Sequence, residues 1–186
     1  ENEVRKKWEL YQLVDEAKNY IKDIIWRMLN ISPTTLDYLG VLKDCYEDDD
    51  ISSLYIFTLN HDVVLEKYFS ANAIEYDSGF TRKTDNLMVW RPSFLDHARY
   101  KIRLLKLHGS VDWFRFRPEG SDWNEEIIGT PKGLTNYHMR DWVGRKIQAL
   151  DRRPLFLVGT YNKILDYVGG IYDDLFYHFY KSTERY

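Results

Sequence analysis

Three compact apolar runs constrain the fold of this chain more than any other feature of its sequence. They read LYIF at 54–57, LLKL at 104–107 and PLFLV at 154–158, and helical or irregular segments separate them. Strands that are buried on both faces appear as near-continuous apolar runs, and such strands are typical of parallel sheets. The pattern therefore predicts an α/β fold with a doubly wound parallel sheet.

Each apolar run ends in polar or small residues. The first is followed by Asn60-His61-Asp62, the second by His108-Gly109-Ser110 and the third by Gly159-Thr160. The carboxyl ends of parallel strands meet at one edge of a sheet, and open α/β sheets bind ligands in the crevice outside that edge. We therefore expect a small-ligand site there.

The remaining elements follow from periodicity and from turn residues. Apolar residues recur at helical spacing through the first thirty positions, and Ser32-Pro33 is typical of the start of a second helix, expected over 33–45. The acidic run at 47–50 ends that helix and reads as a solvated loop, with a cation site as the weaker alternative. Further helices are expected at 63–71, at 141–150 and from 172 to the end of the chain. Strands are expected at 100–107 and 111–117, a hairpin or irregular insertion at 76–90, and a loop at 118–133.

Composition excludes several classes of protein. The formal net charge is −3 and the pI is about 6.0, which gives no case for direct nucleic-acid binding. A single cysteine, Cys45, excludes a disulfide framework and a multi-cysteine zinc site, so we expect no metal. No apolar run approaches the roughly 18 residues that span a membrane, and no signal peptide is recognisable. We expect a cytoplasmic protein with no membrane partner.

Two of the strand ends resemble the motifs of a known family. Thr58-Leu59-Asn60-His61-Asp62 resembles the Thr-x-Asn-x-Asp motif of sirtuins, and Leu107-His108-Gly109 resembles their catalytic His-Gly. With LHGSVDWF and the later PLFLVGTYNK in the same order, the chain is similar to the sirtuin-like NAD hydrolase domains of bacterial antiphage defence systems. The resemblance implies a Rossmann-like fold without a zinc module. Residues 1–50 are then a helical segment, and 51–186 are part of the NAD-binding core.

The chain departs from the sirtuin pattern in two places. Sirtuin-type domains open with a strand and a Gly-rich phosphate loop, whereas the only glycine before Asn60 is Gly40. They also close with a further strand beyond the last helix. We therefore expect this chain to be an internal segment of a longer protein. The sirtuin zinc module needs four cysteines, which argues against an ordinary protein deacetylase.

The resemblance implies roles for the motif residues, and their chemistry suits them. Asn60 can both donate and accept hydrogen bonds, so it can orient ribose hydroxyls or a water, and His108 has an ordinary pKa near 6.5 that suits a base. We predict Asn60 and His108 as catalytic residues. Asp62 would accept from the nicotinamide carboxamide, and the predicted NAD-binding set is completed by Thr58, His61, Gly109 and Ser110.

Each motif residue also has an ordinary structural explanation. Asn60 or Asp62 can cap the helix at 63, and His108 can occupy a turn. Asp112 and Trp113 either support the pocket or belong to an ordinary strand, and Gly159-Thr160 is either a turn or a cofactor contact. Tyr167, Tyr172, Phe176 and Phe179 are spaced as the core face of a helix. His97, His138 and His178 lack ligand spacing.

The sequence leads to one expected function and two alternatives. We expect hydrolysis of NAD, used as substrate, to ADP-ribose and nicotinamide by the effector of a defence system, which acts by NAD depletion in abortive infection. The expected partners are a phage trigger or defence-system component and further copies of the chain. The first alternative is a sirtuin-like module that binds a nucleotide or partner without turnover. The second is an NAD-dependent protein deacylase.

Overall fold

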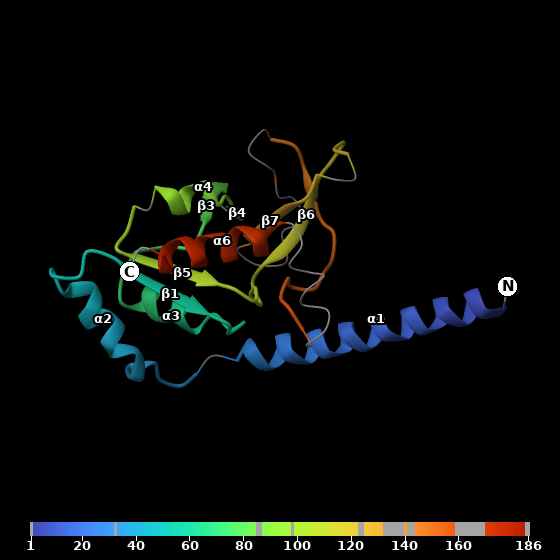
Figure 1. Cartoon of the computed structure of the whole chain (residues 1–186), viewed down its shortest axis with the longest axis horizontal. Helices are drawn as coiled ribbons and strands as arrows, with labels where there is room; N and C mark the ends of the chain where they lie inside the picture. The colour runs from blue at the N-terminus through green and yellow to red at the C-terminus, as the bar shows by residue number, and fades with distance from the viewer. Residues whose placement is uncertain are drawn as a thin grey trace.

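The computed structural model of the chain describes residues 2–31, 33–84, 87–97, 99–122, 125–131, 140, 144–158 and 170–184 (Figure 1). Within these ranges it forms two sheets and several helices. The predictions for Ser32, His138, Tyr167 and Gly159-Thr160 lie outside the described residues.

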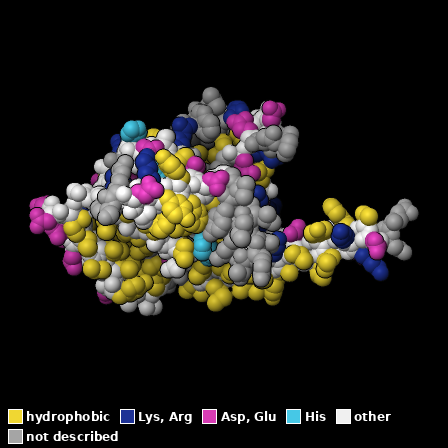
Figure 2. Space-filling view, viewed as in Figure 1, with side chains coloured by type: hydrophobic (Ala, Val, Ile, Leu, Met, Phe, Trp, Pro, Cys, Tyr) yellow, Lys and Arg dark blue, Asp and Glu magenta, His cyan; other side chains and the backbone are white. Residues whose placement is uncertain are grey.

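Helix α1 (Asn2–Leu29) confirms the helical prediction for the first thirty residues, and it projects from the rest of the molecule in Figure 1. Its later turns contact the body of the domain: Trp26 packs edge-on against Phe114 at 6.4 Å, and Asp23 pairs with Arg153 at 2.9 Å. The apolar positions that define its periodicity lie largely on the surface, and Figure 2 shows hydrophobic side chains along the projecting helix. The exposed large apolar residues of α1 are Val4, Trp8, Leu10, Tyr11, Leu13, Val14, Tyr20, Ile21, Ile24 and Met28.

The second helix begins later than predicted. A 3-10 turn, η1 (Asp37–Leu39), leads into α2 (Gly40–Glu47), so the prediction of a helix over 33–45 is wrong at its start. Thr35 accepts a hydrogen bond from the Asp37 amide at 3.3 Å through its hydroxyl, a local bond that competes with helix formation. The acidic run ends this helix, as expected: Glu47 is the last residue of α2, and Asp48 accepts from the Asp50 amide at 2.9 Å in the turn that follows.

The first two apolar runs form the parallel sheet. Strands β1 (Leu54–Thr58) and β5 (Ile102–Lys106) pair in parallel with Thr58 opposite Lys106, and β2 (Tyr76–Asp77) pairs with the other edge of β5. The order is therefore β1-β5-β2.

Helices cover both faces of this sheet. Helix α3 (Val64–Ala71) packs Tyr68 and Phe69 against Ile102 and Leu104, while α6 (Ile171–Thr183) covers the face that contains Leu105. The two helices lie on opposite sides of β1 and β5 in Figure 1. This arrangement confirms the α/β prediction and the helices expected at 63–71 and from 172 onward.

A second, antiparallel sheet lies beside the first. Its order is β3-β4-β7-β6-β8. The strands are β3 (Phe80–Thr84), β4 (Leu87–Trp90), β6 (Phe114–Pro118), β7 (Ile127–Pro131) and β8 (Ile147–Ala149), and α4 (Ser93–Asp96) follows β4. The β3–β4 hairpin confirms the hairpin alternative for 76–90, and β6 confirms most of the strand predicted at 111–117.

Two predictions about this second sheet are wrong. Strand β7 lies in the expected loop at 118–133, where Gly129 and Pro131 had suggested a turn. A Cβ at Gly129 would stand 2.8 Å from the Leu87 side chain and from the Met88 carbonyl, so glycine there permits close strand packing. Strand β8 replaces the described part of the helix expected at 141–150, because buried Ile147 pairs with β6.

The third apolar run does not join the parallel sheet, so that part of the fold prediction is wrong. Phe156 forms a single antiparallel bridge with Gly109, and flanking amides bond to the loop after β5: Leu157 donates to the His108 carbonyl at 2.9 Å. Phe156 is 2% exposed, so the run is buried although it is not a sheet strand. A buried extended segment and a central strand give the same apolar signal.

Candidate functional site at the ends of β1 and β5

The two motif loops leave the same edge of the parallel sheet. Thr58 and Lys106 are opposite each other at the ends of their strands, and the Leu107 amide donates to the Thr58 carbonyl at 2.9 Å. The Thr58 hydroxyl then accepts from the Asn60 amide at 3.0 Å, which closes a tight turn directly after β1. The motif threonine therefore shapes the turn that carries Asn60.

Asp62 and Asn60 differ in how the fold uses them. Asp62 Oδ1 accepts from the Val64 amide at 3.0 Å, so this carboxylate satisfies a donor in the first turn of α3. Asp62 therefore bonds the start of α3, as the structural alternative expected, although Val63 and not Asp62 is the N-cap residue. Asn60 is exposed, and no described residue hydrogen-bonds its carboxamide. The carboxamide remains available to a ligand.

A cavity of about 180 Å³ lies beside this turn. Thr58, Asn60, Asp62 and Lys106 line its polar side, and the remaining wall is formed by Tyr38, Leu39, Val64 and Leu65. Ligand pockets for drug-sized molecules usually measure about 300–1,000 Å³. This cavity therefore has room for one moiety of a dinucleotide, such as a nicotinamide ring or a ribose, and not for the whole molecule.

Lys106 is the residue that sequence reasoning missed. It is 3% exposed, and its ammonium group donates to Glu66 Oε1 at 2.9 Å, to Ser110 Oγ at 2.7 Å and to the Asp62 carbonyl. All three donors of the ammonium group are therefore used. The signal was present in the sequence, because a lysine inside the apolar run LLKL is either exposed or has a buried partner.

These contacts connect the loop that carries Asn60 to the loop that carries His108. Ser110 Oγ also donates to the His61 carbonyl at 3.2 Å, and the Val111 amide donates to the same carbonyl at 2.9 Å. Lys106 therefore joins three parts of the fold in one hydrogen-bond network: helix α3, the loop after β1 and the loop after β5. Ser110 is fully buried within it.

Burial also shifts the pKa values of ionisable groups around this network. Burial raises the pKa of Glu66, while the adjacent Lys106 ammonium opposes that shift. The pKa of Tyr76 is also raised, first by burial and then by the nearby Glu66 and Asp112 carboxylates. Asp112 Oδ1 is buried without a hydrogen-bond partner among the described residues. The region under the loops is therefore rich in charge that the fold holds away from water.

Gly109 occupies a position that only glycine suits. Its φ is +82°, and a Cβ there would lie 2.5 Å from the Leu155 carbonyl oxygen and 2.8 Å from the Phe156 Cα. Both the left-handed backbone and the close approach of 155–156 require the absence of a side chain. Gly109 therefore sets the course of the loop that carries His108.

The two histidines of the motifs lie side by side. The rings of His61 and His108 are 6.1 Å apart between centroids, and the His61 ring is 4.8 Å from that of Phe156. Both histidines are half-buried.

The predicted site residues thus fall into three groups. Thr58, Asn60 and Asp62 line one cavity, whereas His61 and His108 form a ring pair that is not part of its lining. Gly109 and Ser110 are buried in the loop after β5. Their roles towards a ligand stay predictions.

The other residues considered from the sequence lie outside this site. Trp113 is a core residue, 5.0 Å from Phe80 between ring centroids, as the alternative of core packing expected, but it comes just before β6 and is not part of a strand. His97 is exposed, and His178 faces a separate cavity with Asp96 and Lys181. Within the described residues there is no cluster of three or more His, Cys, Asp or Glu side chains that could hold a metal ion. None of the described helices is long and apolar enough to cross a membrane.

Comparison of this sequence with models of known protein families identifies its family. The model of the SIR2-like domain matches residues 55–162, which is more than half of the chain and includes both motif loops. The chain belongs to the SIR2-like domain family. A comparison with curated proteins gave no match. The sirtuin-like part of the prediction is therefore confirmed.

Proposed function

We propose that this SIR2-like domain hydrolyses NAD to ADP-ribose and nicotinamide. The observation that carries the proposal is the exposed Asn60 carboxamide at a cavity outside the carboxyl ends of β1 and β5, with the loop of His108 leaving the same edge. That edge is where open α/β sheets bind nucleotides.

The proposed reaction uses the motif residues in distinct roles. The bond between nicotinamide and ribose C1′ breaks, and its electron pair leaves with the nicotinamide nitrogen. Water then adds to C1′, and His108 takes the proton that the water releases. Asn60 orients the ribose hydroxyls or the water, and as an uncharged amide it does so without quenching the cationic centre.

The volume of the cavity limits which part of NAD it could hold. With about 180 Å³ beside Thr58, Asn60 and Asp62, the cavity would hold the reacting end of NAD, and the Asp62 carboxylate would accept from the nicotinamide amide. His61, Gly109 and Ser110 complete the proposed NAD-binding set. Since Ser110 is buried and bonded to Lys106, we assign it to holding the His61 loop in place.

Nicotinamide release from NAD by the activated full-length protein tests this proposal. Asn60→Ala and His108→Ala should each lower turnover about a hundredfold or more, because each removes a positioned catalytic group. The double variant should be little worse than the poorer single variant, since residues that act as a unit are not additive. His97→Ala is the matched control and should be nearly neutral, because His97 is exposed and outside the site.

A thermal melt of each variant separates loss of chemistry from loss of fold. Folded Asn60→Ala and His108→Ala proteins with near-normal turnover would refute the site assignment. Loss of activity that accompanies melting would mean that these side chains serve only the turn and the loop.

A binding module without turnover is the second candidate. One observation favours it: the Asp62 carboxylate already accepts a hydrogen bond from the Val64 amide at the start of α3. Calorimetric binding of NAD or ADP-ribose with no nicotinamide release, in the activated protein, would select this function. Stimulation of nicotinamide release by an acyl-lysine peptide would select a protein deacylase instead.

The wider setting of the activity is also a proposal, and it rests on the resemblance to antiphage defence domains. We propose a cytoplasmic, homo-oligomeric effector whose activity is held off until a phage component or defence partner engages the protein. Infection of cells that carry the wild type or Asn60→Ala should then deplete NAD only in the former.

A further inference from the structure

Arg103 of β5 stands out because it forms no ion pair with any described residue, whereas Lys106 on the same strand pairs with Glu66. Its Nε and Nη1 atoms are buried, and neither has a hydrogen-bond partner among the described residues. The guanidinium group lies over the Tyr55 ring, 4.7 Å from the ring centroid. This stacking fixes the plane of the guanidinium and leaves its N–H edge free to bind.

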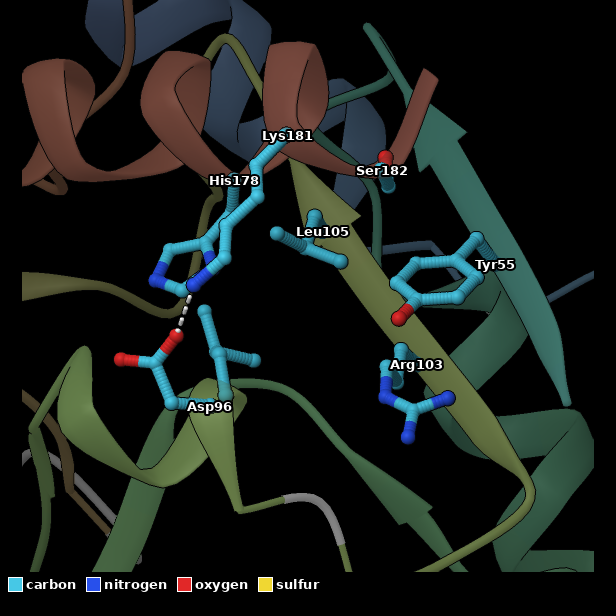
Figure 3. Close-up of a pocket in the computed structure, with 8 residues that line it drawn as sticks. Tyr55, Asp96, Arg103, Leu105, His178, Lys181 and Ser182 are labelled. Atoms are coloured by element: carbon cyan, nitrogen blue, oxygen red, sulfur yellow. Dashed lines mark hydrogen bonds and ion pairs between the residues drawn. The ribbon is translucent and has the colours of Figure 1, made fainter. Parts of the chain in front are cut away.

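The arginine faces a small cavity on the α6 side of the parallel sheet. The cavity measures about 80 Å³ and, in addition to Arg103 and Tyr55, is lined by Leu95, Asp96, Leu105, His178, Lys181 and Ser182. Figure 3 shows Tyr55 and Arg103 on one side of this space, with Asp96 and His178 across from them. Its size suits a single small ion or the end group of a ligand and excludes a nucleotide.

The one carboxylate in the lining does not neutralise Arg103. Asp96 pairs with Lys181 at 2.7 Å, so each of these charges already has its partner. Burial lowers the pKa of His178, which keeps its imidazole neutral at pH 7 and adds no charge. The lining therefore has an excess of one positive charge, located on Arg103.

Arg103 as a whole is only partly buried, but its Nε and Nη1 atoms are held out of water without an acceptor among the described residues. Such donors are costly, and protein structures normally supply them with an acceptor or an opposite charge. We propose that this cavity binds an oxyanion, a phosphate or carboxylate group, which accepts hydrogen bonds from the Arg103 guanidinium. The Tyr55 hydroxyl is a further donor on the same wall. Ser182 contributes less, because its hydroxyl already donates to the Phe179 carbonyl at 2.8 Å.

This site is separate from the proposed NAD site. In the strand register, Arg103 lies opposite Tyr55 and Lys106 lies opposite Thr58. Arg103 and Lys106 are thus three residues apart along β5. Three residues span about 10 Å of strand and place the two side chains on opposite faces of the sheet. An anion at Arg103 would therefore bind near the amino-terminal end of β5 and under α6, away from the Asn60 cavity.

Titration of the full-length protein with inorganic phosphate and with acetate tests the inference, at an ionic strength held constant with chloride. We expect one of these anions to bind with a measurable heat and to raise the melting temperature in proportion to its concentration. Response to phosphate identifies a phosphate group as the ligand, and response to acetate identifies a carboxylate. Arg103→Gln should weaken the binding at least tenfold while Arg99→Gln, a change at a nearby exposed arginine, leaves it intact.

The outcomes that overturn the inference are equally definite. Failure of the wild type to bind either anion, or equal binding by the wild type and Arg103→Gln, would refute it. In the absence of added anion, Arg103→Gln should melt no lower than the wild type, since it removes an uncompensated charge. Should that variant fold poorly, Tyr55→Leu provides a second test, because loss of the ring that fixes the guanidinium should weaken anion binding as well.

Discussion

Lys106→Met is the change that most directly tests how the site is held together. The substitution keeps the length and apolar stem of the side chain but removes the ammonium group. It leaves the Glu66 carboxylate, the Ser110 hydroxyl and the Asp62 carbonyl without their shared donor. Breaking a buried ion pair by removing one partner typically costs about 3–5 kcal/mol. Both side chains of this pair are largely buried, at 4% and 20% exposed, so the full range applies.

That cost converts to a measurable shift in melting. For a protein of this size, 1 kcal/mol corresponds to about 2–4 °C, so Lys106→Met should lower the melting temperature by roughly 6–20 °C. Adding Glu66→Gln to Lys106→Met should restore part of the loss, because the second change removes the stranded carboxylate. Urea unfolding of the four proteins of this cycle gives the coupling free energy directly.

Lys101→Met provides the matched control. Lys101 also donates to backbone carbonyls, including that of Tyr46 at 2.9 Å, but it is only half-buried and pairs with no acidic side chain among the described residues. Its replacement should cost less than about 1 kcal/mol, as expected for a partly solvated bond. If Lys106→Met and Lys101→Met proved equally mild, the Lys106 network would not hold the loops, and the site would need another explanation.

Three further predictions concern other parts of the fold. Gly109→Ala should destabilise the protein by more than about 1 kcal/mol in urea unfolding, because its φ of +82° and the nearby 155–156 backbone exclude a side chain; a neutral effect would contradict this. Asp23→Asn should cost under about 1 kcal/mol, since the pair with Arg153 is partly exposed. The hydrogen bond from Arg153 lowers the pKa of Asp23 below 3.8, so the stabilisation is present above that pH and is lost as the pH falls through the folded-state pKa; melts of wild type and variant should converge there. Burial lowers the pKa of His178 below 6.5, so the wild type should lose stability as the pH falls from 6.5, and His178→Gln should flatten that part of the pH profile.

The apolar runs predicted strands correctly where a partner strand was available to pair with them. The runs at 54–57 and 104–107 are strands because each has a partner strand within reach and a helix on either side. The run at 154–158 gives the same apolar signal, but it is buried against the loop after β5 and forms only the bridge of Phe156 with Gly109. Apolar periodicity reports burial, and it does not report which hydrogen-bond partner a buried segment finds.

The antiparallel sheet shows the opposite failure. Strand β7 contains Gly129 and Pro131, which are turn residues by local preference, yet the neighbouring strands β4 and β6 override that preference. Tertiary context decides strand formation more than local propensity does. Similarly, no local pattern predicts that Lys106 meets Glu66, because the two residues are 40 positions apart and lie on different elements.

The structure also separates the motif residues by what the fold requires of them. Thr58 closes the turn after β1, and Asp62 accepts from the first amide of α3. Gly109 permits the approach of 155–156, and Ser110 joins the Lys106 network. For these four positions, folding alone is a sufficient reason for the residue type.

Asn60 is different. Its side chain is exposed, lines the cavity and takes no part in the described hydrogen bonds, and Leu59 beside it is an apolar residue that is 55% exposed. The same cavity also has apolar side chains in its wall, so the carboxamide is a polar group beside an apolar surface. Positions where a residue has no role in the fold are where function is expected. Asn60→Ala should therefore leave the melting temperature within about 2 °C of the wild type, under about 1 kcal/mol by the same conversion, while it removes nicotinamide release. A large loss of stability in this variant would return Asn60 to the same structural class as Thr58 and Asp62.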